Sequence, residues 1–182
     1  FSLYDHVLDT AVMVGAIPER FGWSGGPVPL ATRFAMARGT SSAGRSPDAD
    51  GCGHAGHGGT PREGGVAALE MTKWFDTNYH YLVPELRPDQ SFFLGDTRVV
   101  DAYIEARGLG FRTRPVLLGP VSFLMLAKCA GETFDRLRLL PGLLPVYTHV
   151  LRLLAAAGAT ELQLDEPVLV LDENPAVAAA VA

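Results

Sequence analysis

One cysteine and two histidines lie close together in the stretch GCGHAGHGG, residues 51–59, and these residue types bind zinc. A closed structural zinc site needs four ligands. Cys52, His54 and His57 supply three, and the chain contains no second cluster of this kind. The context therefore argues against a structural zinc site, and weak metal capture by these three side chains is the alternative that remains.

The glycines of the same stretch fit a second motif. Gly51, Gly53 and Gly56 match G-x-G-x-x-G, the fingerprint of dinucleotide-binding loops. That fingerprint requires a strand before the first glycine and a helix after the last one. No strand is predicted before Gly51 and no helix after Gly56, so the dinucleotide interpretation also fails.

A pair of carboxylates, Asp165 and Glu166, directly follows the apolar stretch ELQL, residues 161–164. Paired carboxylates at the end of a strand can bind substrate or transfer protons. The alternative is a structural role in which they accept hydrogen bonds from neighbouring loops. The pattern alone leaves both open.

The elements that position these residues are predicted from hydrophobic spacing, turn residues and cap residues, with Ser2 as the expected N-cap of the first helix. The spacing predicts helices at 2–15, 30–38, 66–75, 96–107, 121–130 and 143–157, and strands at 79–83, 114–118 and 161–164. Short apolar strands separated by crossover helices imply a parallel sheet built from βα units. A barrel and a doubly wound sheet give the same alternation.

Residues 39–65 differ from the rest because they contain almost no large apolar side chain. Such a segment cannot bury enough surface to offset the entropy of ordering it. We expect a flexible, glycine-rich insertion. It is either a lineage-specific loop or the product of a local reading-frame or assembly error in the gene sequence.

Composition excludes several classes of protein. A net charge of −5 with no basic stripe gives no reason to expect nucleic acid as a partner. Two cysteines are too few for a disulfide framework, which favours a cytoplasmic protein. No apolar run is expected to reach the ~18 residues of a membrane helix. The ends lack cap signals, so we expect a segment of a longer protein.

Five blocks carry a family resemblance, in the right order. They are FSLYDHVLDTA at 1–11, EMTKWFDTNYHYLVPE at 70–85, RPVLLGPVSFLMLAK at 114–128, LPVYTHVL at 144–151 and LQLDEPVLVLD at 162–172. Together they resemble the N-terminal domain of the cobalamin-independent methionine synthase family. The resemblance covers nearly the whole chain except 39–65.

The resemblance implies a fold and an activity. Members of the family have two (β/α)8 barrels, so residues 1–182 are expected to be an incomplete N-terminal TIM-type barrel, roughly its second to fifth βα units, in the α/β class. The enzymes transfer a methyl group from 5-methyltetrahydrofolate polyglutamate to homocysteine. They use zinc bound by the C-terminal barrel and no cobalamin. The isolated chain is expected to be catalytically inactive.

The resemblance also points to site residues. Lys73 is expected to contact the anionic polyglutamate tail of folate, since a lysine can act as a flexible point charge for carboxylates. The alternative is a surface lysine paired with Glu70 on a helix. Asp76, Asn78 and His80 are weaker candidates for a polar wall around the substrate, or form a turn and a strand.

Because the zinc chemistry of the family lies in the other barrel, the resemblance favours structural roles or inter-barrel packing for Asp165 and Glu166 over substrate binding. Two other functions remain open. The chain is a truncated, inactive remnant that at most binds folate, or it belongs to another methyltransferase or decarboxylase on a related barrel. The specific EMTKWFDTNYHY match disfavours the latter.

Overall fold

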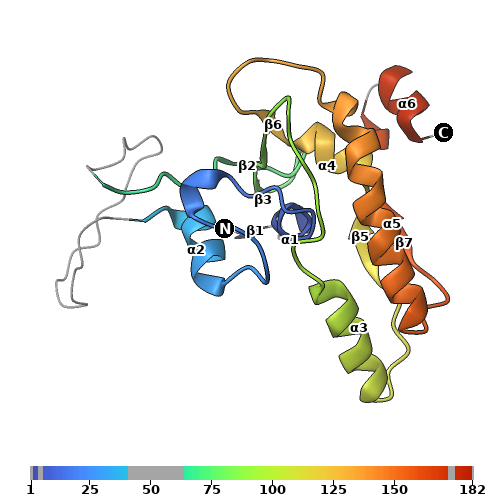
Figure 1. Ribbon diagram of the computed structural model, residues 1–182. Helices are drawn as coiled ribbons and strands as arrows, with labels where there is room; N and C mark the ends of the chain where they lie inside the picture. Colours follow the sequence, from blue (N-terminus) through green and yellow to red (C-terminus); the bar gives the residue numbers. More distant parts are fainter. Residues whose placement is uncertain (1, 4–5, 41–63, 172–174, 182) are drawn as a thin grey trace.

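A computed structural model describes residues 2–3, 6–40, 64–171 and 175–181 (Figure 1). Cys52, His54 and His57, and most of the predicted insertion, lie outside these residues. The helices are α1 His6–Met13, α2 Leu30–Arg38, α3 Arg98–Gly108, α4 Pro120–Leu126, α5 Leu140–Ala156 and α6 Pro175–Val181. Short 3₁₀ helices are η1 Glu19–Phe21, η2 Arg136–Leu139 and η3 Pro167–Val170. The strands are β1 Ser2–Leu3, β2 Met71–Lys73, β3 Tyr79–Leu82, β4 Glu85–Leu86, β5 Val116–Leu118, β6 Lys128–Cys129 and β7 Gln163–Asp165.

The strands form three small sheets, with the orders β1-β3-β2, β4-β6 and β5-β7. Three strand pairs are parallel, namely β1 with β3, β4 with β6 and β5 with β7. Only β2 and β3 run antiparallel among the described strands. The chain is therefore a mixed α/β protein. Within the described ranges the sheets do not close into a barrel.

The predicted helix at 66–75 is wrong, because Met71–Lys73 forms strand β2 against β3. The pairing extends beyond the strand, where the Val83 N–H donates to the Glu70 carbonyl over 2.8 Å. The residues of this segment favour a helix on their own, but only by ~0.5 kcal/mol per residue. Pairing with β3 outweighs this preference.

Two other boundaries differ from the prediction for the same reason. The first helix begins at His6, since Ser2 and Leu3 pair with β3, so Ser2 is not its N-cap. Helix α4 ends at Leu126, and the Lys128 N–H donates to the Pro84 carbonyl over 2.9 Å as β6 begins. The helix predicted at 30–38 is confirmed by α2.

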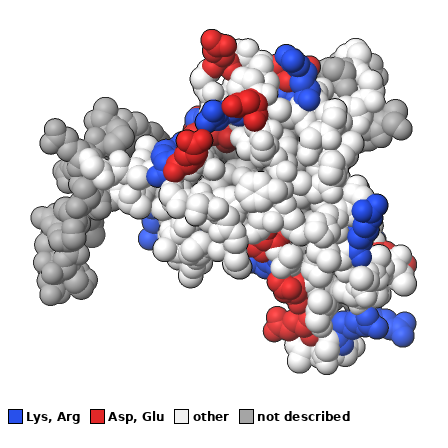
Figure 2. Space-filling model, in the orientation of Figure 1, with Lys and Arg blue, Asp and Glu red and all other residues white. Residues whose placement is uncertain are grey.

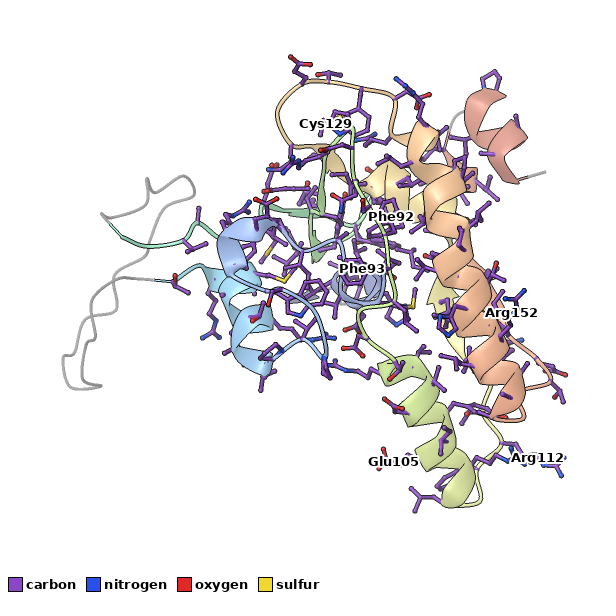
Figure 3. The ribbon with its side chains drawn as sticks, viewed as in Figure 1. Phe92, Phe93, Glu105, Arg112, Cys129 and Arg152 are labelled. Atoms are coloured by element: carbon purple, nitrogen blue, oxygen red, sulfur yellow. The ribbon has the colours of Figure 1, made fainter. Side chains whose placement is uncertain are left out.

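Helix α1 lies at the centre of the molecule, seen end-on in Figure 1, with α2 on one side and β5, α5 and α3 on the other. Its Val7, Ala11 and Val12 are almost completely buried. The connection from β4 to α3 passes beside it, and Figure 3 shows Phe92 and Phe93 on that connection. There the Phe93 N–H donates to the Val14 carbonyl over 3.2 Å. The core is therefore built around α1.

Helix α5 qualifies the expectation about membranes. By length and composition alone, Arg136–Ala156 is long and apolar enough to cross a membrane, so the expectation that no stretch reaches this length is wrong. A core helix passes the same test. In the structure, α5 packs against α4 and buries Leu143, Val150 and Leu154 in the main core, and 28% of the apolar window is buried.

Candidate functional site

The β2–β3 hairpin carries four of the six predicted site residues. Its register places Lys73 directly opposite His80. The Trp74 N–H donates to the Tyr79 carbonyl over 2.7 Å, and the Thr77 N–H donates to the Trp74 carbonyl over 3.1 Å. These bonds close a tight turn between the two strands. Asp76 and Asn78 lie in that turn.

Lys73, Asp76, Asn78 and His80 are called the hairpin site from here on. The side chains of Lys73, Asp76 and Asn78 are exposed, and His80 is half-buried. The His80 Nδ1 lies 3.0 Å from the Asn78 carbonyl oxygen, which fixes the ring beside the turn. The structure therefore brings the four polar residues together on one exposed turn. Tyr79, the adjacent aromatic residue, is 54% exposed.

Lys73 has no ion-pair partner within the described residues. The alternative in which Glu70 neutralises it is wrong, because Glu70 pairs with the Lys128 Nζ at 2.9 Å. That alternative assumed a helix, in which residues three apart are neighbours. On a strand, side chains three apart point to opposite faces. The exposed ammonium group of Lys73 is thus available to an anion.

The turn is anchored by two aromatic rings. The Trp74 ring meets the Phe75 ring edge-on at a centroid distance of 5.0 Å and the Tyr81 ring at 5.8 Å. Trp74 packs against the main core. Phe75 packs against a separate cluster of Val121, Val168 and Val177. The exposed polar groups of the turn therefore stand on a packed aromatic base.

The two predicted carboxylates lie at the end of β7 and have different partners. Glu166 accepts hydrogen bonds from two backbone N–H groups at the start of α4, Val121 at 3.1 Å and Ser122 at 2.6 Å. The Asp165 carboxylate accepts from the Gln163 side-chain amide at 2.7 Å. Glu166 thus ties the end of β7 to α4, which is the geometry of a structural role. Neither carboxylate belongs to the hairpin.

Two buried tyrosines reinforce this region, and the sequence did not reveal their contacts. The Tyr147 hydroxyl donates to the Leu118 carbonyl at 2.7 Å, and burial, together with the Glu166 charge, raises the pKa of Tyr147. The Tyr81 hydroxyl donates to the Leu126 carbonyl at 3.1 Å. Burial raises the pKa of Tyr81, an effect that Arg136 opposes and Glu70 strengthens. Both hydroxyls therefore stay protonated and act as structural donors.

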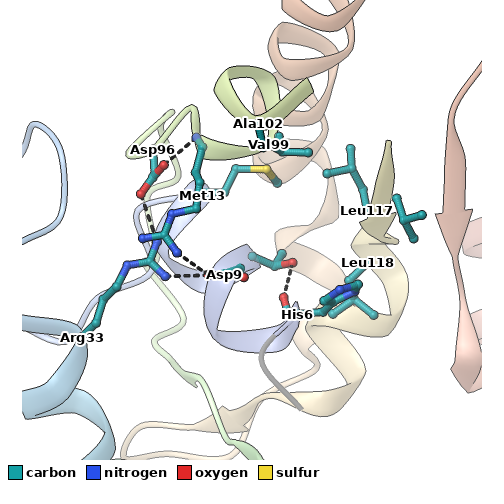
Figure 4. A pocket seen from close by; sticks show the side chains of 12 residues that line it. His6, Asp9, Met13, Arg33, Asp96, Val99, Ala102, Leu117 and Leu118 are labelled. Atoms are coloured by element: carbon teal, nitrogen blue, oxygen red, sulfur yellow. Dashed lines mark hydrogen bonds and ion pairs between the residues drawn. The ribbon is translucent and has the colours of Figure 1, made fainter. Parts of the chain in front are cut away.

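A charged cluster beside α1 was also missed. The Arg33 guanidinium is buried and pairs with Asp9 at 2.5 Å and Asp96 at 3.0 Å. Arg98 adds a pair with Asp9 at 3.5 Å. Figure 4 shows Arg33 reaching from α2 towards both carboxylates. The available signal was the spacing of Arg33 and Met36, which puts the arginine on the buried face of its helix.

This cluster borders a cavity of about 190 Å³ with a mainly apolar floor from Met13, Val99 and β5. Opposite charges in the cluster balance one another, since each arginine faces a carboxylate. The cluster therefore joins α1, α2 and the start of α3 through ion pairs. We call the pairs of Arg33 with Asp9 and Asp96 the Arg33 clamp.

Metal binding finds no support in the described part of the chain, which contains no group of three His, Cys, Asp or Glu side chains able to hold an ion. On the face drawn in Figure 2, acidic and basic side chains form small groups separated by uncharged surface. That face carries no continuous basic surface of the kind that binds a phosphate backbone.

Comparison with known proteins supplies a family context. Residues 1–182 match the model of the family described as "Cobalamin-independent synthase, N-terminal domain". Three curated relatives carry the name 5-methyltetrahydropteroyltriglutamate–homocysteine methyltransferase. The relative from Caulobacter vibrioides is 65% identical over 94% of this chain, the one from Mesorhizobium japonicum 58% over 96%, and the one from Salinibacter ruber 53% over 99%. The chain spans 22% of the length of each of these relatives.

Proposed function

Because the chain belongs to the family of cobalamin-independent synthase N-terminal domains, we propose that it serves an enzyme that transfers the methyl group of 5-methyltetrahydropteroyltriglutamate to homocysteine. The names of the relatives support this reaction, and the product of methylating homocysteine is methionine. We assign to this chain the binding of the folate polyglutamate substrate. We further propose that homocysteine and zinc are bound by parts of the longer enzyme outside this chain.

The observation that carries the proposal is the exposed Lys73 ammonium group, which pairs with no carboxylate among the described residues and lies on a hairpin anchored by Trp74 and Phe75. A polyglutamate tail presents several carboxylates, and a lysine on a fixed base can meet one of them without losing an existing partner. Asp76, Asn78 and His80 provide hydrogen-bonding groups beside it. The described carboxylates and histidines do not fit zinc, so no step through a metal is assigned to this chain.

The fold proposal is that the parallel pairs β1–β3 and β5–β7 are parts of a (β/α)8 barrel in the longer enzyme. Gly119-Pro120 follows β5 and Glu166-Pro167 follows β7, and residues at the ends of strands face the substrate in barrels of this type. We also propose a cytoplasmic location without a nucleic-acid or membrane partner, in keeping with the low cysteine content and acidic balance.

The test is a chimera in which this chain replaces the matching segment of the Caulobacter vibrioides relative. Methyl transfer to homocysteine is measured with the triglutamate and the monoglutamate of 5-methyltetrahydrofolate. We expect an active chimera in which Lys73→Ala raises the KM for the triglutamate about tenfold, the effect of losing one charge-assisted contact. The KM for the monoglutamate should change little.

Arg112→Ala is the matched control, because it removes one exposed positive charge on the connection between α3 and β5, outside the hairpin. It should leave both KM values unchanged. An inactive chimera beside an active parent enzyme would favour the inactive remnant. An unchanged triglutamate KM in Lys73→Ala would remove Lys73 from the binding site.

A further inference from the structure

Phe75 has a backbone conformation that aromatic residues rarely adopt. Its φ is 51°, and it is the one non-glycine residue with a positive φ in the described part of the chain. The left-handed region brings Cβ close to the following carbonyl oxygen, so it costs energy unless the surroundings hold it. Phe75 lies between Lys73 and Asp76, so its conformation sets the direction of the hairpin site.

The ring of Phe75 supplies the holding contact. It is partly buried against Val121 at the start of α4, Val168 in η3 and Val177 in α6. The Trp74 ring meets it edge-on. Packing of this kind can stabilise a strained turn only if the surface under the ring is itself fixed.

Glu166 fixes that surface. Its carboxylate accepts from the Val121 and Ser122 N–H groups at 3.1 and 2.6 Å, which joins the end of β7 to the first turn of α4. In return, the Ser122 hydroxyl accepts from the Val168 N–H at 3.3 Å. These bonds hold Val121 and Val168 side by side, although they lie far apart in the sequence.

We propose that Glu166 is a positioning residue for the hairpin site. By holding Val121 and Val168 together it maintains the surface that keeps Phe75 left-handed, and Phe75 in turn orients Lys73. The structural consequence can be tested without any ligand. The functional consequence, orientation of Lys73 for the folate tail, rests on the proposed function.

The test is amide hydrogen exchange of the full chain with Glu166→Gln, resolved by residue. Gln keeps the size of the side chain but loses the charge and one of the two acceptor oxygens. We expect exchange to accelerate about tenfold at the Trp74 and Thr77 amides of the turn, as well as at Val121 and Ser122. Glu161→Gln, at an exposed carboxylate of the α5–β7 connection, is the control and should change neither group.

Acceleration confined to Val121, Ser122 and their neighbours would show a local role for Glu166 and overturn the proposal. If Glu166→Gln does not fold, Ser122→Ala tests the same surface, since it removes the acceptor for Val168. It should also accelerate Trp74, and an unchanged Trp74 in this variant would equally contradict the proposal.

A double-mutant cycle tests whether Glu166 affects exchange at Trp74 through the Phe75 ring or through a general loss of stability. Phe75→Gly accepts the positive φ without strain but removes the ring. In that background Glu166→Gln should cause no further acceleration at Trp74, whereas equal effects in both backgrounds would refute transmission through the ring. In the chimera, Glu166→Gln should raise the triglutamate KM. If the wild-type chimera does not use folate, the proposed function fails while the exchange result stands.

Discussion

Glu166 occupies the space where a side chain on Gly119 would lie. Gly119 has an ordinary extended backbone, with a φ of −69°, so conformational freedom is not the reason for a glycine there. A Cβ added at this position would overlap the carboxyl group of Glu166. Gly119 is therefore required by close approach.

Gly119→Ala should lower the free energy of unfolding by about 2 kcal/mol, because the displaced carboxylate would lose its bonds to the Val121 and Ser122 N–H groups. Urea denaturation measures this. In a Glu166→Ala background the same substitution should cost far less, since the overlapping group is gone. Gly108→Ala, in open space at the end of α3, is the control and should be neutral or slightly stabilising. Equal costs of Gly119→Ala in both backgrounds would contradict the explanation.

The buried Tyr147 should make stability depend on alkaline pH. Its folded pKa is raised above the ordinary value of 10.0, so the unfolded chain loses this proton first. Stability from this group is complete below pH 10 and falls as the pH rises further, by about 1.4 kcal/mol per pH unit.

Tyr147→Phe removes that titration and also the hydrogen bond to Leu118, at a cost of about 1 kcal/mol at neutral pH. The advantage of the wild type over Tyr147→Phe should therefore shrink between pH 10 and pH 11. Chemical denaturation of both proteins across this range measures the difference. A constant gap would show that Tyr147 ionises normally.

The Arg33 clamp should contribute strongly to stability. Arg33→Met leaves the Asp96 carboxylate, whose side chain is 15% exposed, without its cation. We expect a loss of about 3 kcal/mol, at the low end for a broken buried pair because Asp9 is 44% exposed and keeps Arg98. Arg38→Ala, at the exposed end of the same helix, should cost less than about 1 kcal/mol. Comparable losses in the two variants, measured by thermal unfolding, would argue against the clamp.

Several elements could be predicted because their signals are local. Apolar spacing and flanking glycines or prolines were enough for α2, for the core of α5 and for β3. Strand β2 was mispredicted as a helix because its residues favour a helix on their own, while the pairing that makes them a strand comes from β3. A preference set by a partner strand outside the segment leaves little trace in the segment itself.

The candidate site divides in the same way. Lys73, Asp76, Asn78 and His80 were chosen from a family motif, and the hairpin brings them together because they are close in sequence. The contacts that hold the site are distant in sequence, such as Glu166 with Val121 and Arg33 with Asp96. The left-handed Phe75 could not be foreseen either, since its conformation depends on a surface made by α4 and η3.

The ends of the segment 41–63 are joined by a short antiparallel bridge. The Thr40 N–H donates to the Val66 carbonyl at 2.9 Å, and the Val66 N–H donates back to Thr40 at 3.0 Å. Next to this bridge, on the side of α2 and β2, the Leu69 N–H donates to the Met36 carbonyl at 2.8 Å. The path from α2 to β2 is therefore closed by hydrogen bonds between described residues on either side of the segment.

Replacing 41–63 by a short Gly-Ser linker should consequently leave the hairpin site unchanged. The free energy of unfolding should stay equal or rise by about 1 kcal/mol, since each halving of a loop lowers its closure cost by about 0.6 kcal/mol. Trp74 fluorescence and the triglutamate KM of the chimera should not change. The replacement also removes Cys52, His54 and His57, so any weak zinc binding by them should disappear.

Val66→Pro, which removes one bridge donor, is the contrasting variant and should be destabilising. A less stable shortened chain, or an altered triglutamate KM, would show that 41–63 contributes to the site and is more than a connection between α2 and β2.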